Sequence, residues 1–229
     1  MKRKVIIIVC IGIFTTGLFA FAQKDVLWSY REGKKDSLDI TLAHYNRGLY
    51  LETTDEKKLA AEHYKQALLI TPNFPEARNN LGAVLYDLKR FDDAIVELRQ
   101  AIQLRPGFVA AHYNLATAYF ALNRFSDAAE AYHEAIELLP DFIDAYYFLA
   151  QCYNQMGEFN QAVKILERVI ELQRDHIYAH YGLANNLFAS KKMKRALYHY
   201  ERVLEIDPTF PEADEIHNMI AEIEALQLK

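Results

Sequence analysis

The sequence predicts an all-α fold, a solenoid of repeated helix pairs, and three observations support this prediction. Prolines recur at steps of 34, 34 and 68 residues, which defines a 34-residue unit: Pro72, Pro106, Pro140 and Pro208. Within each unit, apolar and small residues recur at the spacing of a helix face. The 229-residue chain contains only 8 glycines and 6 prolines, which is low for a fold of many strands and turns.

An export signal is predicted for residues 1–22. A positively charged start, Met1 to Lys4, precedes an apolar stretch from Val5 to Ala22, and small residues at Ala20 and Ala22 place the cleavage site before Gln23. The alternative is an uncleaved anchor, because the length of this stretch, 18 residues, is near the lower limit for spanning a bilayer. We expect an exported protein, periplasmic or secreted, with a membrane-tethered form as the alternative.

The chain that follows the signal is acidic and carries one thiol. Losing Lys2, Arg3 and Lys4 leaves 23 basic residues against 31 acidic ones, so the net charge changes from −5 to 23 − 31 = −8. A nucleic-acid partner is therefore not expected, since it requires a basic face. The remaining cysteine, Cys152, has no partner for an internal disulfide. A buried apolar role is the favoured interpretation, with a reactive thiol or an intermolecular disulfide as the alternative.

A short lead-in, residues 23–40, precedes the repeats, and Ser37 or Asp39 is a candidate cap for the first helix. Its apolar residues either pack on the first repeat or bind a partner: Val26, Leu27, Trp28 and Tyr30.

Five copies of the unit then follow without insertion: 41–74, 75–108, 109–142, 143–176 and 177–210. In the second copy, apolar spacing predicts helices over Glu76–Leu88 and Phe91–Leu104, and proline at Pro106 ends the pair. Two 34-spaced series hold small residues, which let helix backbones approach closely. They are Ala60, Ala94, Ala128, Ala162 and Ala196, and Gly48, Gly82, Ala116, Ala150 and Ala184.

A capping helix is predicted in the last segment, 211–229. From Pro211 to Leu226, apolar residues form one stripe and acidic residues occupy the other face. Such a helix covers the apolar end of a stack of repeats.

Residues 41–210 resemble the tetratricopeptide repeat family. The match is clearest in the second copy, which has Asn80-Leu81-Gly82 followed by Ala94, Leu98, Ala101 and Pro106. The chain departs from the family where a tryptophan is frequent, because that position holds His44, Arg78, His112, Tyr146 and His180. The resemblance implies a right-handed superhelix whose first helices line a concave groove that binds an extended peptide or a partner helix.

Carried over by position, the resemblance implies candidate groove residues rich in tyrosine and amides: Tyr45, Asn46, Asn79, Asn80, Tyr113, Asn114, Tyr147, Gln151, Tyr181 and Asn185. Tyrosine gives a large contact area, and an amide side chain pairs with a peptide backbone. Two interpretations stay open for the asparagines, ligand binding or bonds between neighbouring helices, and for the tyrosines, groove surface or packing between helices. These positions hold no lysine or arginine, so we expect a neutral or basic segment rather than an acidic tail.

Catalytic and metal-binding patterns were sought and none is convincing. The sequence has no Gly-rich phosphate loop, nucleophile elbow or HExxH run. His176 and His180 have the spacing of a metal-binding helical pair, but we expect a helix boundary between them and see no acidic third ligand. We therefore expect no enzyme, no metal and no cofactor.

The function predicted from the sequence is that of a non-catalytic adaptor in the cell envelope, which binds a protein partner of unknown identity and contacts membrane only through an uncleaved N-terminal segment. Two alternatives remain. One is an accessory subunit of an envelope transporter or enzyme that helps to bind a small solute. The other is a structural homo-oligomer assembled through the apolar ends of the solenoid.

Overall fold

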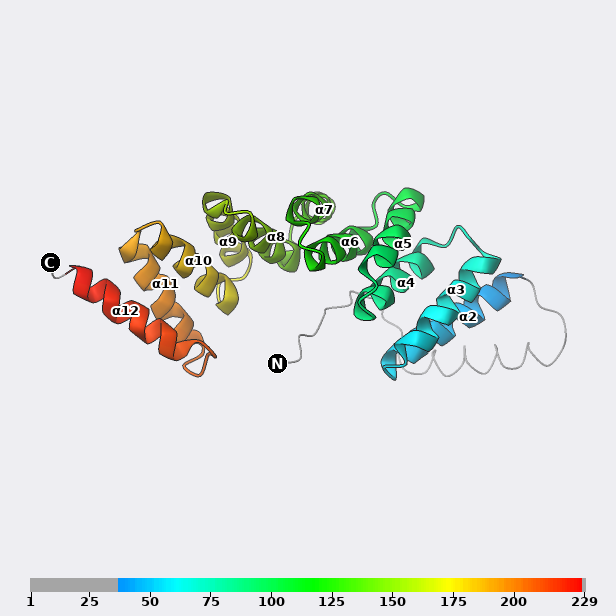
Figure 1. Ribbon diagram of the computed structural model, residues 1–229, viewed down its shortest axis with the longest axis horizontal. Coiled ribbons are helices and arrows are strands. Elements are labelled where there is room, and N and C mark those ends of the chain that lie inside the picture. Colours follow the sequence, from blue (N-terminus) through cyan, green and yellow to red (C-terminus); the bar gives the residue numbers. More distant parts are fainter. Residues whose placement is uncertain (1–36, 228–229) are drawn as a thin grey trace. The chain divides into compact units, whose positions relative to one another are not determined.

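The computed structural model describes residues 37–227, and eleven α-helices make up this described part of the chain (Figure 1). They are α2 (Ser37–Thr53), α3 (Lys57–Ile70), α4 (Pro75–Asp87), α5 (Phe91–Leu104), α6 (Val109–Ala121), α7 (Phe125–Leu138), α8 (Ile143–Gln155), α9 (Phe159–Leu172), α10 (Ile177–Ala189), α11 (Met193–Ile206) and α12 (Ala213–Gln227). The predicted all-α repeat fold is therefore confirmed. The predicted signal, 1–22, and the lead-in up to residue 36 lie outside the described residues.

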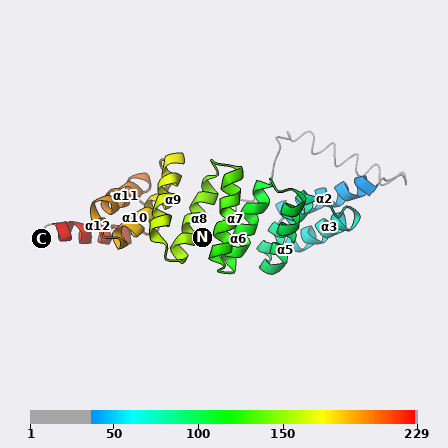
Figure 2. The same ribbon diagram turned by 90° about the horizontal axis from the view of Figure 1, so that it is seen from above.

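Within the N-terminal part and within the C-terminal part of the described chain, each helix packs on the next. In the N-terminal part, α2 packs on α3, α3 on α4, α4 on α5 and α5 on α6. In the C-terminal part, α7 packs on α8, and the same order continues to α12 (Figure 2). One helix pair cannot bury its own apolar face, so stacking supplies the missing cover.

The turn inside every repeat ends the first helix with a left-handed residue. These residues occupy one 34-spaced position, with φ between 57° and 76°: Asp55, Lys89, Asn123, Gly157 and Lys191. In the second repeat, the N–H of Lys89 donates to the carbonyl of Tyr86 (2.8 Å), and the N–H of Arg90 to that of Leu85 (2.9 Å). This pair of bonds is a helix-terminating Schellman arrangement, which satisfies carbonyls that the helix leaves without partners.

The small residues lie where helices approach most closely, as predicted. The alanines of the first series are all fully buried. A Cβ on Gly82 would lie 2.5 Å from Cγ of the fully buried Leu98 in α5, and one on Gly48 would lie 2.6 Å from the ring of Tyr64 in α3. Glycine at these two positions therefore fixes the distance between the helices of a pair.

The described chain divides into two compact units, and the division falls inside the third repeat, between α6 and α7. Unit 1 comprises α2–α6 and ends at Asn123, and unit 2 comprises α7–α12 and begins at Arg124. The core of unit 2 runs from Ala150 in α8 to Ile223 in α12.

The two ends of the described chain differ slightly from the predicted boundaries. Helix α2 begins at Ser37, so residues 37–40 are helical rather than part of the lead-in, and the Thr41 hydroxyl donates to the Ser37 carbonyl (2.9 Å). Helix α12 begins at Ala213, two residues after Pro211, and buries Ile216 and Ile223 completely. None of the described helices combines the length and the apolar character that crossing a membrane requires.

Candidate functional site

The first helix of each repeat carries the predicted partner-binding residues, and burial separates them into different roles. In unit 1 they are Tyr45 and Asn46 on α2, Asn79 and Asn80 on α4, and Tyr113 and Asn114 on α6. In unit 2 they are Tyr147 and Gln151 on α8, and Tyr181 and Asn185 on α10.

The asparagines of unit 1 form a chain of hydrogen bonds between first helices. Asn114 Nδ2 donates to Asn79 Oδ1 (3.0 Å), Asn79 Nδ2 to Asn80 Oδ1 (3.1 Å), and Asn80 Nδ2 to the Tyr45 hydroxyl (3.2 Å). Asn79 is 4% exposed and Asn80 is 6% exposed. Of the two interpretations left open by the sequence, this geometry favours bonds between helices for Asn79, Asn80 and Asn114. Asn46 is exposed.

The tyrosines of unit 1 are largely part of the packing. Tyr113 is only 4% exposed, so its side chain does not present a binding surface. Tyr45 is half-buried, with its ring centroid 4.8 Å from Phe74 and 5.7 Å from Tyr64. Sequence periodicity placed Tyr113 and Tyr147 at equivalent positions, but burial assigns them different roles.

Two amides of unit 2 also make internal bonds. The hydroxyl of the buried Tyr200 in α11 donates to Asn185 Oδ1 (2.7 Å), although Asn185 itself is exposed. Asn186, one residue later and buried, donates to Asn154 Oδ1 on α8 (2.9 Å). Gln151 is half-buried.

Unit 2 contains an aromatic cluster, which we define as Tyr147, His176, Tyr178, Tyr181 and Phe210. Tyr147 lies 5.3 Å from His176 and 6.5 Å from Tyr178, measured between ring centroids. Phe210 lies 5.5 Å from Tyr178 and 5.4 Å from Tyr181. Phe210 is the buried base of the cluster, whereas Tyr178 is 44% exposed and the other three are half-buried.

Three members of the aromatic cluster were missed as site residues, although the sequence carried a signal for two of them. His176 and Phe210 belong to a 34-spaced series that ends each repeat: Phe74, Phe108, Phe142, His176 and Phe210. Tyr178 has no such signal, because its equivalents in the other repeats are not aromatic: Leu42, Glu76, Ala110 and Asp144.

Carboxylates lie beside two members of the aromatic cluster, Tyr181 and His176. Burial raises the pKa of Tyr181, and the neighbouring carboxylates of Glu215 and Glu212 act in the same direction. Burial also raises the pKa of Asp144, an effect that the adjacent His176 opposes. Burial lowers the pKa of His176, so its ring is neutral at neutral pH and adds no positive charge to this surface.

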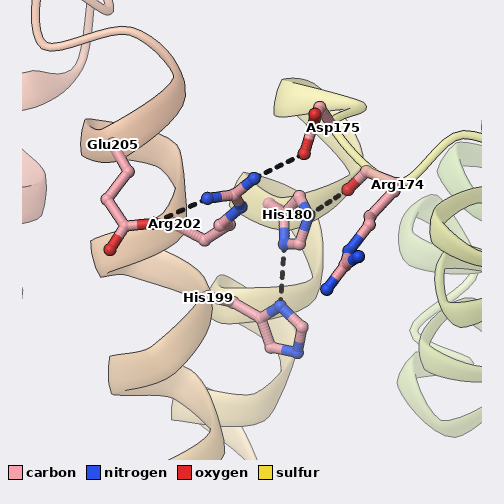
Figure 3. A network of polar contacts seen from close by, with 6 residues as sticks. All are labelled: Arg174, Asp175, His180, His199, Arg202 and Glu205. Atoms are coloured by element: carbon pink, nitrogen blue, oxygen red, sulfur yellow. Dashed lines mark hydrogen bonds and ion pairs between the residues drawn. The ribbon is translucent and has the colours of Figure 1, made fainter.

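His180 and His199 in the fifth repeat lie in a network of polar contacts (Figure 3). His176 Nδ1 accepts the N–H of Ala179 (3.1 Å) and caps α10, so a helix boundary does separate it from His180, as predicted. His180 Nε2 lies 2.9 Å from the Arg174 carbonyl, and its Nδ1 lies 2.9 Å from His199 Nδ1. Within residues 37–227, no three His, Cys, Asp or Glu side chains are grouped to hold a metal ion.

The tautomers of this histidine pair follow from its partners. A carbonyl only accepts, so His180 Nε2 carries a hydrogen and donates to Arg174. In a neutral ring the other nitrogen then accepts, so His199 Nδ1–H donates to His180 Nδ1. Beside the pair, Arg202 bridges Asp175 (2.6 Å) and Glu205 (2.7 Å).

Cys152 is fully buried in α8, and burial raises the pKa of its thiol to about 12. A thiol in this state is not a nucleophile at neutral pH, so Cys152 contributes to the core.

Comparison with protein families assigns most of the described chain. Family profiles described as "TPR repeat" match residues 58–89 and 82–123, and profiles described as "Tetratricopeptide repeat" match residues 123–185 and 177–210. Together they span residues 58–210. A search of curated protein sequences found no match.

Solved structures with similar folds include two that are described as MamA and one as YrrB. A MamA crystal structure is 27% identical, with a TM-score of 0.69, and the match covers 72% of this chain and 96% of MamA. A MamA fragment from Desulfovibrio magneticus RS-1 is 19% identical, covering 75% and 97%, with a TM-score of 0.71. YrrB, described as a TPR protein with an unusual peptide-binding site, is 19% identical, covering 84% and 97%, with a TM-score of 0.71.

Proposed function

Because the chain belongs to the tetratricopeptide repeat family, whose fold is that of protein-interaction scaffolds, we propose that it is a non-catalytic adaptor of the cell envelope that binds a segment of a partner protein. The segment lies along the first helices of the repeats. The export signal predicted from Met1 to Ala22 supports the location in the envelope.

The aromatic cluster of unit 2 is the observation that carries this proposal. Tyr178 is 44% exposed and stands beside the half-buried Tyr147 and Tyr181, so a partner segment meets three phenol rings on adjacent first helices. Tyrosine combines a large contact area with a hydroxyl and loses little side-chain entropy on binding. A peptide ligand for this fold is consistent with YrrB, a TPR protein described as having an unusual peptide-binding site.

The proposal now excludes some residues that the sequence indicated. Asn79, Asn80 and Tyr113 are buried and are assigned to packing within unit 1, together with Asn114, which donates to Asn79. The remaining contact residues are Tyr147, Gln151, Tyr181 and Asn185 in unit 2, joined by Tyr178, with Tyr45 and Asn46 as secondary candidates in unit 1.

Crosslinking capture in native envelopes tests the adaptor function. Full-length protein with Tyr147→Ala and Tyr181→Ala is expected to lose partners that the wild type captures, as identified by mass spectrometry, while its circular dichroism stays helical. Tyr198→Ala is the matched control, since Tyr198 is 57% exposed on α11, outside the aromatic cluster. Equal capture by the double variant and the control would contradict the proposal.

The same sample tests the proposed export. We expect the N-terminal peptide of the captured protein to begin at Gln23, because signal peptidase cuts after the small residue Ala22. A protein that begins at Met1 and sediments with membranes would favour the tethered form.

A further inference from the structure

Three carboxylates lie beside members of the aromatic cluster in unit 2. Glu212 and Glu215 lie beside Tyr181, and Asp144 lies beside His176. In the part of the chain that the structure describes, neither Glu212 nor Glu215 forms an ion pair. A hydrogen bond with Tyr181 holds Glu215 beside the aromatic cluster, and a cationic ligand would supply the missing ion-pair partner.

Unit 1 provides a contrast at an equivalent position. Glu76 stands one repeat position after proline, as Glu212 does, but Glu76 forms an ion pair with Arg105. Tyr45 and Phe74 are also in ring contact in unit 1 (4.8 Å between centroids), but there the position of the exposed Tyr178 holds Leu42, which has no ring. Unit 2 thus combines the exposed ring of Tyr178 with carboxylates that lack an ion-pair partner among the described residues.

An electron-rich ring beside a carboxylate is a favourable environment for an arginine or lysine side chain. The cation is attracted to the face of the ring, and a carboxylate pairs with it through charge-assisted hydrogen bonds. Neutral and acidic segments gain neither interaction, and an acidic one is repelled by the three carboxylates.

We infer that the aromatic cluster of unit 2 docks an arginine- or lysine-bearing extended segment of a partner protein, with the cationic side chain over Tyr178 and paired with Glu212 and Glu215. This inference rests on the proposed adaptor function and adds the chemistry of the segment that is bound. It also places the charge-selecting contacts at Tyr178 in the fifth repeat, at Glu212 just before the capping helix and at Glu215 in the first turn of that helix.

Fluorescence anisotropy with labelled peptides tests the charge selection on the full-length chain. The probes are peptides of equal length that carry arginine, glutamine or glutamate at the same positions and are otherwise identical. We expect the arginine peptide to bind at least about five-fold more tightly than the glutamine peptide, and the glutamate peptide to bind most weakly. Raising the salt from about 50 to about 300 mM should weaken binding of the arginine peptide.

Matched variants locate the site. Tyr178→Ala and the double variant Glu212→Gln, Glu215→Gln should each weaken the arginine peptide at least about five-fold. The glutamine substitutions keep the side-chain shape, so they separate loss of charge from loss of fold. Tyr198→Ala and Glu201→Gln change exposed residues of the same types on α11, outside the aromatic cluster, and should keep wild-type affinity.

Three results would overturn the inference: equal affinity for the arginine and glutamine peptides, no binding of any probe, or site variants that bind like the controls. Failure of the adaptor function gives a different pattern, because the Tyr147→Ala, Tyr181→Ala variant then captures the same envelope proteins as the wild type. If that variant abolishes capture while the peptides show no charge preference, the adaptor stands and the cationic ligand is wrong.

Discussion

One position in the first helix shows how single residues join a helix pair. His44 Nδ1 lies 3.0 Å from His63 Nδ1, Arg78 donates to Glu97 (2.7 Å), and His180 pairs with His199 (2.9 Å). The same position also reaches back to the end of the preceding repeat, since Arg78 donates to the Pro72 carbonyl and His180 to that of Arg174. These polar pairs occupy the position where related repeats often have tryptophan.

The His180–His199 pair makes unit 2 sensitive to acid. Burial, followed by the neighbouring charges of His180 and Arg195, lowers the pKa of His199 to about 4. Burial also lowers the pKa of His180; Arg202 acts in the same direction, and the Arg174 carbonyl and Asp175 oppose it. Both rings are therefore neutral in the folded chain at pH 7. Adding a proton to either ring is unfavourable, because the charge would be buried away from water.

We predict that unit 2 loses stability as the pH falls from about 6.5 toward 4. The unfolded chain binds protons on His199 below its ordinary pKa of 6.5, whereas the folded chain does so only near pH 4, so acid favours unfolding. From pH 7 to pH 5, His199 alone should lower the free energy of unfolding by roughly 2 kcal/mol. Urea denaturation followed by circular dichroism at the two pH values measures this change.

Two variants show whether His199 is responsible. His199→Ile copies Ile165 of the fourth repeat and should flatten the pH dependence, whatever its stability at pH 7. His217→Gln changes an exposed histidine of α12 and should keep the wild-type slope. An unchanged slope in His199→Ile would contradict the assignment.

At the scale of the helices, close contact at glycine is the feature that decides packing. A Cβ on Gly82 would lie 2.5 Å from Leu98 Cγ, whereas one on Gly182 in α10 would lie 3.4 Å from Leu166 Cδ1, an ordinary contact. The two glycines are both inside first helices, so they have similar backbone roles but different surroundings.

We predict opposite effects of alanine at these two glycines. Gly82→Ala should lower the free energy of unfolding by about 2 kcal/mol, because Leu98 is fully buried and has no room to move. Gly182→Ala should leave it unchanged or raise it by up to about 1 kcal/mol, through the better helix propensity of alanine. Urea titration of both proteins checks the signs, and equal destabilisation would show that crowding by Leu98 is not the cause.

The helices were largely predictable from the sequence, because a 34-residue period repeats both the apolar face and the proline that follows. The predicted second helix of the second repeat, Phe91–Leu104, coincides with α5, and the first helix, Glu76–Leu88, differs from α4 by one residue at each end. The left-handed residues were not predicted, since four of the five are not glycine and the helix pair imposes their conformation.

The binding surface was less predictable than the helices. The 34-residue period predicts which face of a helix a residue occupies. The exposure of that residue also depends on what packs against the face, so Tyr113 is buried whereas the equivalent Tyr147 is only half-buried. The amide bonds between Asn79, Asn80 and Asn114 depend on side-chain rotamers that periodicity does not specify. Tyr178 escaped notice because its position is aromatic in the fifth repeat alone.

At the scale of the whole molecule, the chain divides into two compact units, and unit 2 has a hydrophobic core that extends from α8 to α12. Repeat proteins gain stability from each repeat and from its nearest neighbours, so a local defect is felt mainly nearby. Gly82 contacts Leu98 in unit 1, and Ile223 belongs to the core of unit 2, so the two positions share no partner.

We therefore predict additive and separately located effects of Gly82→Ala and Ile223→Ala. Removing the fully buried Ile223 side chain should cost about 3 kcal/mol, and the double variant should lose the sum of the two single effects within about 0.5 kcal/mol. Hydrogen exchange measured by mass spectrometry should show faster exchange in α4 and α5 for the first variant and in α11 and α12 for the second. Faster exchange throughout the chain in either single variant would contradict two separate units.

The polar pairs between first and second helices also bear on how the chain avoids misfolding. Five helix pairs of nearly the same pattern give every first helix several second helices that fit its apolar face. A wrong pairing of α4 with α7 or α9 would place the Arg78 guanidinium opposite Ala131 or Ile165 and leave it without its carboxylate, at a cost that the correct pairing avoids. The two histidine pairs have interchangeable chemistry, but they stand in the first and last repeats, where the long intervening chain disfavours their exchange. The side chains at this one position thus favour the correct pairing among helices whose apolar patterns are otherwise similar.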